Sequence, residues 1–393
     1  MSEMRSRADG KRLILFLEDH IDSANAPELE QQINALREGG SYEEIELNCG
    51  QLQYIFSAGL RVILRLRREV NEVLMTDVSP EVYEILDVTG FTELVTVQKA
   101  YRVVSVEGCE VIGQGANGKV YRIDPETIVK VYYSLEALPE IRRERELART
   151  AFVLGIPTAI PYNIVRVEDH YGAVFELLNA KSFLKLLTEQ VKPLEEVVAM
   201  SIELLKSIHA TQTQDPIMPS MKQVALGWAD FLKDYLPADQ YGKLHSLIEE
   251  VPESDHMLHG DYHLKNIMYQ KGESLLIDMD TLCVGHPIFE LASMYNAYVG
   301  YGETDEKVTT EFLGVSRETA QEIWDRSLRL YLDGMDEEKV REIEKKAMLI
   351  GYTRIMRRTI RRNGLNTADG QILIECCRKH IEELLQIVDT LLF

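Results

Sequence analysis

The stretch from Leu258 to Asp280 constrains this chain most, because it places polar side chains at fixed spacings between apolar segments. Asp261 is followed five positions later by Asn266, and a second pair of acids, Asp278 and Asp280, ends the next apolar run. The apolar flanks indicate that both clusters are anchored to a packed scaffold. Carboxylate and amide oxygens in this arrangement suit phosphoryl transfer, in which one carboxylate orients or deprotonates an acceptor hydroxyl and the others hold magnesium against nucleotide phosphates.

The pattern His-x-Asp-x-x-x-x-Asn, formed by His259, Asp261 and Asn266, resembles the catalytic loop of the protein-kinase-like superfamily. The His-Gly-Asp sequence and the Ile-Asp-Met-Asp segment that follows are most similar to the aminoglycoside and choline phosphotransferase branch. The resemblance implies that Asp261 is the base or acceptor-positioning residue and that Asn266 and Asp278 are metal ligands. It also places His259 among the catalytic-loop residues, where we expect it to brace the loop through hydrogen bonds. The alternative is that the Asp and Asn residues only cap turns.

The composition narrows the class of protein. The chain of 393 residues is long enough for two or three domains, and 45% hydrophobic with 27% charged residues describes a globular protein. The formal net charge of −21 argues against nonspecific binding to nucleic acid or to anionic membranes, because both need a basic surface. No apolar run approaches the roughly 18–20 residues of a membrane span, and no signal-like core follows the first residues. We therefore expect a cytoplasmic protein with neither nucleic acid nor membrane among its partners.

The five cysteines lack Cys-x-x-Cys spacing, so we expect reduced thiols and no zinc site.

The first hundred residues alternate between strand and helix patterns, which predicts a small α/β sheet domain. Strands are expected at 11–17, 44–47, 73–76 and 94–97, and helices at 26–39, from 57 onward and at 80–86. The turn Tyr54–Leu60 and the segment Asp87–Phe91 resemble the anti-sigma-factor antagonist family, the STAS domain, over residues 10–99. The resemblance implies a regulatory domain that contacts a protein partner.

Ser57 falls on the serine that accepts phosphate from a partner kinase in that family. Phe56 and Ala58 replace the acid and the second serine that flank this position there. A phosphate on Ser57 would lie at a helix N-terminus, which favours an anion. The alternative, which we favour, is that Ser57 is an N-cap residue. A solvent-facing Phe56 would be an apolar anchor for a partner, whereas a buried one would be ordinary core.

The segment with Gly113, Gly115, Gly118 and Val120 reads Gly-x-Gly-x-x-Gly-x-Val between two strand patterns. Glycines let a backbone approach phosphates closely. A dinucleotide-binding fold would follow this motif with a helix, whereas here a strand pattern follows, which fits the hairpin loop of kinases. The alternative is a glycine turn without function.

Lys130 interrupts the apolar strand pattern Thr127–Tyr132, so its charge needs a partner. The kinase resemblance supplies nucleotide phosphate and a glutamate from the next helix, at 138–154. The resemblance favours Glu144 over Glu146, because its distance from the helix end matches the family. The resemblance also implies that the backbone of Glu176 and Leu178 reads the adenine edge.

The remaining chain has mostly helical patterns, and three polar features in it call for an interpretation. We expect His263 to be a loop histidine near phosphate and Glu290 to brace the backbone of the catalytic loop. A basic cluster at Arg354, Arg357, Arg358, Arg361 and Arg362 stands out in an acidic chain. We expect that these arginines do not all share one helix face, so that some are solvated while others, such as Arg358, meet an anionic acceptor or the acidic N-terminal domain.

The expected fold is an α/β STAS-like domain at 1–100, followed by an α+β two-lobed protein-kinase-like fold. That fold has a small β-rich N-lobe at 101–180 and a large helical C-lobe at 181–393. The expected function is that of an ATP- and Mg²⁺-dependent phosphotransferase acting on a hydroxyl of a small molecule. The alternatives are a protein kinase acting on Ser57 or a similar serine in another chain, and a catalytically silent scaffold. The complete set of Lys130, Asp261, Asn266 and Asp278 favours catalysis. No Ala-Pro-Glu motif follows the pattern at 258–280, where protein kinases carry one, and this disfavours a protein acceptor.

Overall fold

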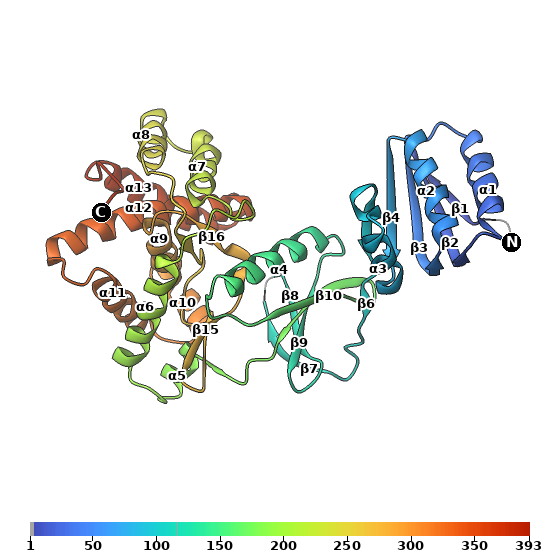
Figure 1. Cartoon of the computed structure of the whole chain (residues 1–393). Helices are drawn as coiled ribbons and strands as arrows, with labels where there is room; N and C mark the ends of the chain where they lie inside the picture. The colour runs from blue at the N-terminus through green and yellow to red at the C-terminus, as the bar shows by residue number, and fades with distance from the viewer. Residues whose placement is uncertain (1–3, 116) are drawn as a thin grey trace. The chain divides into compact units, whose positions relative to one another are not determined.

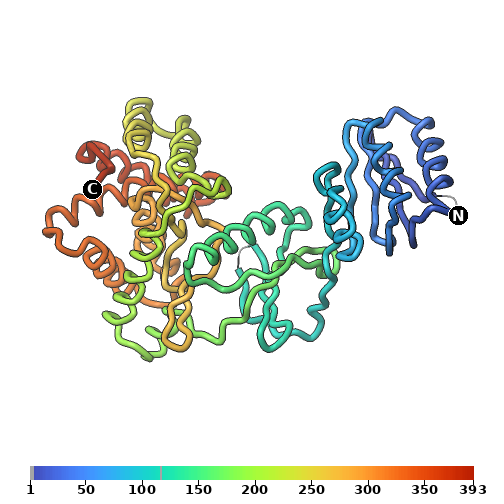
Figure 2. Tube along the Cα trace, viewed as in Figure 1, coloured from blue at the N-terminus to red at the C-terminus, as the bar shows by residue number. Residues whose placement is uncertain are grey.

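The computed structural model describes residues 4–115 and 117–393. It divides into two compact units, Met1–Val104 and Ser105–Phe393, each built from one uninterrupted stretch of chain (Figures 1 and 2). Ala116 of the glycine-rich segment and the first three residues of the expected N-terminal domain lie outside the described residues.

The first unit is an α/β domain around a five-stranded sheet in the order β1-β2-β3-β4-β5. Strands β2 to β5 are parallel, and β1 pairs antiparallel with β2 at the edge. Parallel neighbours need crossover connections, which the helices supply. The strands are β1 (Ser6–Asp9), β2 (Arg12–Ile21), β3 (Glu44–Ile55), β4 (Glu72–Val78) and β5 (Thr96–Lys99), and the helices are α1 (Ala26–Glu38), α2 (Ser57–Glu69) and α3 (Pro80–Val88).

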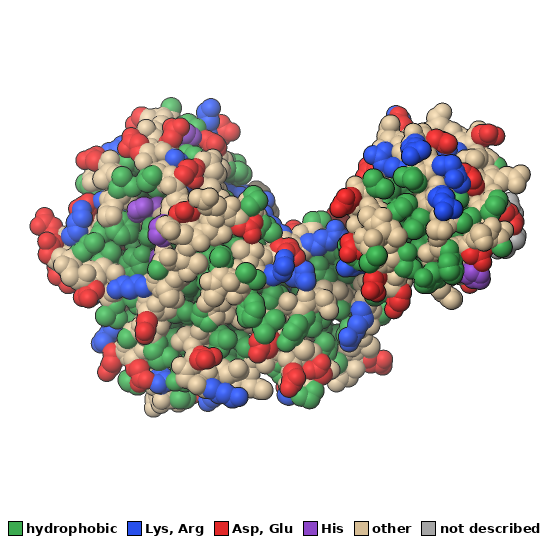
Figure 3. Space-filling view, in the orientation of Figure 1, with side chains coloured by type: hydrophobic (Ala, Val, Ile, Leu, Met, Phe, Trp, Pro, Cys, Tyr) green, Lys and Arg blue, Asp and Glu red, His purple; other side chains and the backbone are tan. Residues whose placement is uncertain are grey.

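Helix α2 shows how the apolar pattern builds this unit. Its Leu60, Ile63 and Leu66 are buried in the unit's own core, which is formed entirely by residues between 13 and 95. A Cβ at Gly59 would lie 2.6 Å from Ile21 Cγ2, so a glycine is needed where α2 crosses the sheet. The outward side is rich in arginine, and basic side chains gather over this helix on the face drawn in Figure 3.

The expectation that Ser57 caps α2 is wrong. Phe56 occupies the N-cap position with extended backbone, φ −93° and ψ 172°, and Ser57 is the first helical residue. The carbonyl of Phe56 already accepts the first helical bond, from the amide of Leu60. Both Phe56 and Ser57 are exposed, and the Phe56 ring packs 4.5 Å from the ring of Tyr54, which is exposed as well.

The second unit begins with an antiparallel sheet in which β10, β11, β9, β8 and β7 lie in that order. The strands are β7 (Glu110–Gln114), β8 (Gly118–Arg122), β9 (Thr127–Tyr132), β10 (Pro161–Val167) and β11 (His170–Glu176). Helix α4 (Leu138–Val153) contacts β10 and β11. Residues 103–106 have the apolar composition of a strand, but only the two-residue β6 (Arg102–Val103) forms, because Ser105 Oγ accepts from the amide of Glu107 and turns the chain.

The rest of the second unit is mostly helical, with a few short strands, and surrounds a single large core that runs from Leu147 to Leu391. None of the helices in the described part of the chain combines the length and apolarity needed to span a bilayer. The helices are α5 (Phe183–Thr188), α6 (Leu194–Ala210), α7 (Met221–Phe231), α8 (Ala238–Glu249), α9 (Ile288–Tyr298), α10 (Glu306–Leu313), α11 (Arg317–Tyr331), α12 (Glu337–Arg361) and α13 (Ala368–Leu385).

Candidate active site

Two short antiparallel ladders hold the stretch from Leu258 to Asp280. Strand β13 (Met257–Leu258) pairs with β16 (Cys283–Val284), and β14 (Ile267–Gln270) pairs with β15 (Glu273–Leu276). The amide of Ile277 donates to the carbonyl of Asn266 at 3.0 Å. These ladders bring the two acid-bearing segments side by side.

Glu290 braces the catalytic loop from beneath, as expected. This fully buried carboxylate on α9 accepts from the amides of His259 and Gly260. Burial alone would raise the pKa of Glu290, but the nearby His209, whose Nε2 lies 3.8 Å from Glu290 Oε2, and the amide of Gly260 lower it below its ordinary value. Gly260 has φ +80°, and a Cβ there would collide with the carbonyl oxygen of Thr281. The loop therefore requires glycine at this position.

His259 lies behind the loop. Its ring is fully buried, with Nε2 3.2 Å from the carbonyl oxygen of Ile277 and Nδ1 accepting from the amide of Asp261 at 3.3 Å. The structure thus gives His259 contacts that orient Asp261 through backbone, and does not bring its ring to the wall of the cavity that Asp261 lines.

Asp261 faces His263, whose Nε2 lies 3.5 Å from Asp261 Oδ2. His263 lies in the loop, as expected, and its ring is buried and packs edge-on against Phe312 of α10 at 5.1 Å. Its position near phosphate stays a prediction. Burial alone would raise the pKa of Asp261, but the hydrogen bond and charge of His263, with Arg354 and His259, hold it well below its ordinary range. Asp261 is therefore ionised at neutral pH.

Lys130 is held between two carboxylates. Its Nζ lies 2.8 Å from Glu144 Oε1 and 3.0 Å from Asp278 Oδ1. Glu144 is buried, and its other oxygen accepts from the hydroxyl of Tyr132. Burial lowers the pKa of Lys130, but the two carboxylates outweigh it and the net shift is upward, so the ammonium stays charged. Glu146 pairs instead with Arg145 at 2.7 Å.

The carboxylates next to Lys130 form a donor set for a hard cation. Asp278 adopts a left-handed backbone, φ 63°, and Asp280 follows in the turn η3 (Met279–Thr281). Burial and the charges of Asp278 and Glu144 raise the pKa of Asp280 to about 7. Asn266 also faces this cavity, with its Nδ2 donating to the carbonyl of Asp261 at 3.1 Å. Crowded carboxylates with an amide oxygen are ligands that Mg²⁺ prefers, and a divalent cation would relieve their mutual repulsion.

One cavity of about 1070 Å³ connects these groups. It brings together the site residues named from the sequence, apart from His259, Ser57, His263 and Glu290, which do not line it. The named residues that line it are Gly113, Gly115, Gly118, Val120, Lys130, Glu144, Glu176, Leu178, Asp261, Asn266 and Asp278. The amide of Glu176 already donates to the carbonyl of Ile160 at 3.0 Å, so an adenine at this residue would use its carbonyl.

The three motif glycines differ in what the fold requires of them. A Cβ on Gly118 would collide with the carbonyl oxygen of Val131 in the neighbouring strand. A Cβ on Gly113 would make only an ordinary contact with Val120, and one on Gly115 would meet no described atom within 4 Å. Gly118 is therefore needed for strand packing, whereas the other two leave open backbone beside the cavity.

The five arginines of the basic cluster all line this cavity from α12 and the residue after it. The expectation that they do not share one face is wrong. Their spacing of three, four, seven and eight residues places them along one side of a helix. The spacing of the arginines is visible in the sequence, but only the packing of α12 shows that this side of the helix faces the cavity.

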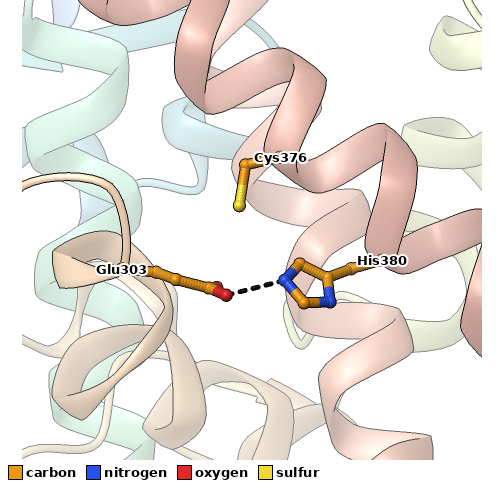
Figure 4. Close-up of side chains that lie close together, drawn as sticks. All are labelled: Glu303, Cys376 and His380. Atoms are coloured by element: carbon orange, nitrogen blue, oxygen red, sulfur yellow. Dashed lines mark hydrogen bonds and ion pairs between the residues drawn. The ribbon is translucent and has the colours of Figure 1, made fainter.

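A second cluster of possible metal ligands lies apart from the residues of this cavity and consists of Glu303, Cys376 and His380 (Figure 4). Glu303 Oε1 lies 2.6 Å from His380 Nε2, and its Oε2 accepts from the hydroxyl of Tyr352 at 2.6 Å. Burial and Glu303 raise the pKa of the Cys376 thiol, which keeps it protonated and a poor ligand. These contacts join α13 to the segment at Glu303 through hydrogen bonds.

Comparison with known proteins gives two family matches. The model of the phosphotransferase enzyme family, APH, matches residues 108–322, and that of the STAS domain matches residues 3–104. The proposed anti-sigma factor antagonist BtrV of Bordetella bronchiseptica is 36% identical over 86 residues, which are 21% of this chain and 73% of that protein.

Two solved structures are also similar. A thermostable mutant of aminoglycoside phosphotransferase APH(4)-Ia is 12% identical, with 71% of this chain and 94% of that chain covered and a TM-score of 0.48. A choline/ethanolamine kinase family protein from Mesorhizobium loti is 14% identical, with 71% and 88% covered and a TM-score of 0.48.

Proposed function

Because the chain belongs to the phosphotransferase enzyme family and carries a STAS domain at its N-terminal side, we propose that it transfers the γ-phosphate of ATP to a hydroxyl of a small molecule, with Mg²⁺ as cofactor. The observation that carries this proposal is one cavity in which Lys130, Asp261, Asn266 and Asp278 meet. Phosphoryl transfer depends mainly on positioning and on charge stabilisation, and these four side chains supply both.

The nucleotide end is formed by the glycine-rich segment and Lys130. Lys130 is charged and already fixed by Glu144, so it can bind phosphate oxygens without reorganisation. Open backbone at Gly113 and Gly115 leaves room for the phosphates. The backbone of Glu176 and Leu178 would contact adenine.

Asn266 and Asp278 would hold Mg²⁺, with Asp280 close by. When bound, the cation neutralises charge on the phosphates. The contact of Lys130 with Asp278 fixes this carboxylate within reach of the same phosphates that Lys130 would bind.

Asp261 would receive the acceptor hydroxyl. Its pKa lies far below that of an alcohol, so it is a weak base and acts mainly by orienting the hydroxyl, with the proton transferred late. The ring of His263 contacts the Asp261 carboxylate, and the ring of His259 accepts from the Asp261 amide. Together these contacts hold Asp261 in place.

Thermal unfolding with and without ATP and Mg²⁺ tests the nucleotide half of the proposal, because a ligand that binds the native state raises stability. We expect a Mg²⁺-dependent upward shift for the wild type and a smaller one for Glu144→Gln. Glu146→Gln is the matched control on the same helix, and it should behave as wild type because Glu146 pairs outside the cavity. No shift in any condition would contradict the proposal and favour a silent scaffold.

ADP release with a panel of hydroxyl compounds tests the transfer half. Asp261→Asn should lower acceptor-dependent release by about 10²–10⁴-fold, the usual contribution of a positioned base, while the thermal shift with ATP persists. Equal release by this variant and the wild type would remove Asp261 from the reaction.

Ser57 supports a second candidate function, phosphorylation of the STAS domain itself. It is exposed at the first residue of α2, where a phosphate would meet free helix amides. Intact mass after incubation with ATP and Mg²⁺ tests this: we expect one added phosphate in the wild type and none in Ser57→Ala. An unchanged wild-type mass would eliminate this version.

A further inference from the structure

The wall of the cavity beside Asp261 is strongly basic. We define the arginine cluster as Arg354, Arg357, Arg358, Arg361 and Arg362, which lie along one side of α12 and its C-terminal residue. Lys185 and Lys265 line the same cavity. This concentration of positive charge occurs in a chain whose formal net charge is −21.

Acids of the protein do not neutralise the arginine cluster. Among the described residues, no carboxylate lies within the 4.0 Å of an ion pair from any of its members, although arginines elsewhere pair regularly, as Arg329 does with Glu337 at 3.0 Å. Arg354 donates to the carbonyl of Gly260 and to Ser293 Oγ, at 2.9 and 2.8 Å. Arg358 donates to the hydroxyl of Tyr301 at 2.7 Å. Their partners are neutral.

Arg357 shows the strain of this arrangement. Its Nε is buried and has no hydrogen-bond partner among the described residues. Burial, followed by the charges of Arg361 and Arg354, lowers the pKa of this guanidinium. Buried polar groups are nearly always satisfied in folded proteins, and an open donor within a group of like charges is suited to bind an anion.

Arg354 connects the arginine cluster to the acceptor end of the cavity rather than to the nucleotide end. Lys130 and the glycine-rich segment supply the phosphate contacts at the nucleotide end. Arg354 is tied instead to the carbonyl of Gly260, next to Asp261, and its charge helps to keep Asp261 ionised. Trp228 of α7 lies 5.5 Å from the Arg354 guanidinium and lines the same part of the wall.

From these contacts we propose that the phosphate acceptor is an anion: a small hydroxyl compound that already carries a phosphate or a carboxylate group. This inference rests on the proposed function. Guanidinium groups bind both anions through paired, charge-assisted hydrogen bonds. A cationic acceptor, such as an amino sugar or a quaternary amine, would be repelled by the same wall, which makes the arginine cluster a source of specificity.

ADP release against a panel of four compound classes tests the proposal: sugar phosphates, sugar acids, neutral polyols, and cationic amino sugars with choline. We expect release above the acceptor-free rate only with the two anionic classes, and their comparison tells phosphate from carboxylate. Preference for a neutral or cationic compound, or transfer to an acidic protein instead, would overturn the proposal. A silent panel together with an intact thermal shift for ATP and Mg²⁺ also overturns it and leaves the nucleotide half of the proposed function standing. Loss of that shift overturns the proposed function itself.

The double variant Arg358→Gln/Arg361→Gln makes the test specific to the cluster. The fold-increase in the KM for the anionic acceptor should be about ten times the fold-increase in the KM for ATP. The reason is that two charge-assisted contacts are removed at the acceptor end. The double variant Arg358→Lys/Arg361→Lys keeps the charge and should recover part of the loss. Arg329→Gln, which removes a paired surface arginine of α11, is the control and should change neither KM. An equal rise in both KM values would contradict the assignment.

Discussion

His263 influences the candidate active site through its contact with Asp261. It lies two positions after Asp261, is buried against Phe312, and directs Nε2 toward the Asp261 carboxylate. Because this contact is a main cause of the low Asp261 pKa, removing it should raise that pKa.

We therefore predict that His263→Asn moves the acid limb of the kcat/KM profile to higher pH. In the proposed mechanism the ionised form of Asp261 is the active one. Activity is then lost as pH falls through the pKa of Asp261, so a higher pKa moves this loss to higher pH. A pH–rate profile measures this. His245→Asn, a partly exposed histidine near Asp230, is the control. An unmoved limb would show that His263 has only a structural role.

His286 should contribute to acid sensitivity of the fold. Burial, with the charges of His209 and Lys346, lowers its pKa from 6.5 to about 4. Between these values the unfolded chain binds a proton that the native state excludes, so stability falls as pH drops through this window. From neutral pH to about pH 5 the loss is at most about 2 kcal/mol, and less because the ring is partly exposed.

Urea unfolding at both pH values checks this prediction. The loss of unfolding free energy on acidification should be smaller in His286→Asn than in the wild type. The same loss in both proteins would assign the acid sensitivity to other groups.

At the level of residues, the sequence could predict what lies within one loop or one strand. Asp261, Asn266 and Asp278 follow a local spacing, and Lys130 is conspicuous because its strand is apolar. The burial of the His263 ring could not be predicted from the loop alone, because it packs against Phe312 of α10, which is distant in the sequence. Ser57 was misjudged because the strand before it stays extended through Phe56.

The β-strands that carry the glycine-rich segment pack closely at one point. Gly118→Ala should destabilise the second unit by about 1–3 kcal/mol, because its Cβ would overlap the backbone of β9 and force the strands apart. Gly115→Ala should change stability by less than about 0.5 kcal/mol, since nothing described lies near its Cβ.

Urea unfolding of the two glycine variants makes this comparison. The ATP-dependent thermal shift should fall in Gly115→Ala despite its wild-type stability. Similar destabilisation in both variants would contradict the distinction between a packing glycine and a ligand-facing one.

Helix α12 was the element that sequence reasoning described least well. One side supplies buried residues such as Ile350, Ile355 and Met356, and the other supplies the arginine cluster. Its apolar periodicity indicated a helix, but which residues of α7 and α9 it meets depends on contacts between distant segments. Strand β10 was missed because it begins at a proline and because Asn163 and Arg166 interrupt its apolar residues.

The whole molecule consists of two units with separate hydrophobic cores. The expected fold class, an α/β STAS-like domain followed by a kinase-like fold, is confirmed. That prediction rested on the alternating strand and helix patterns and on two sets of motifs, the STAS-like and the kinase-like. Both can be recognised in the sequence without knowing how distant segments pack.

Separate cores predict that each unit folds on its own. Fragments 1–104 and 105–393 should each unfold cooperatively by calorimetry or circular dichroism, because each buries its apolar residues internally. The second fragment should keep the ATP-dependent thermal shift of the full chain. A fragment 105–393 that does not fold, or that folds without this shift, would show that the second unit depends on the first.

Arg354 also limits how the proposed enzyme could evolve. The same guanidinium lies in the cavity wall and holds the carbonyl of Gly260 beside Asp261. A lineage that evolved specificity for cationic acceptors could replace the outer arginines Arg358, Arg361 and Arg362 one at a time. Exchanging Arg354 would loosen the catalytic loop at the same step. Descendants with altered charge preference should therefore retain this one arginine and show their adaptive substitutions further along α12.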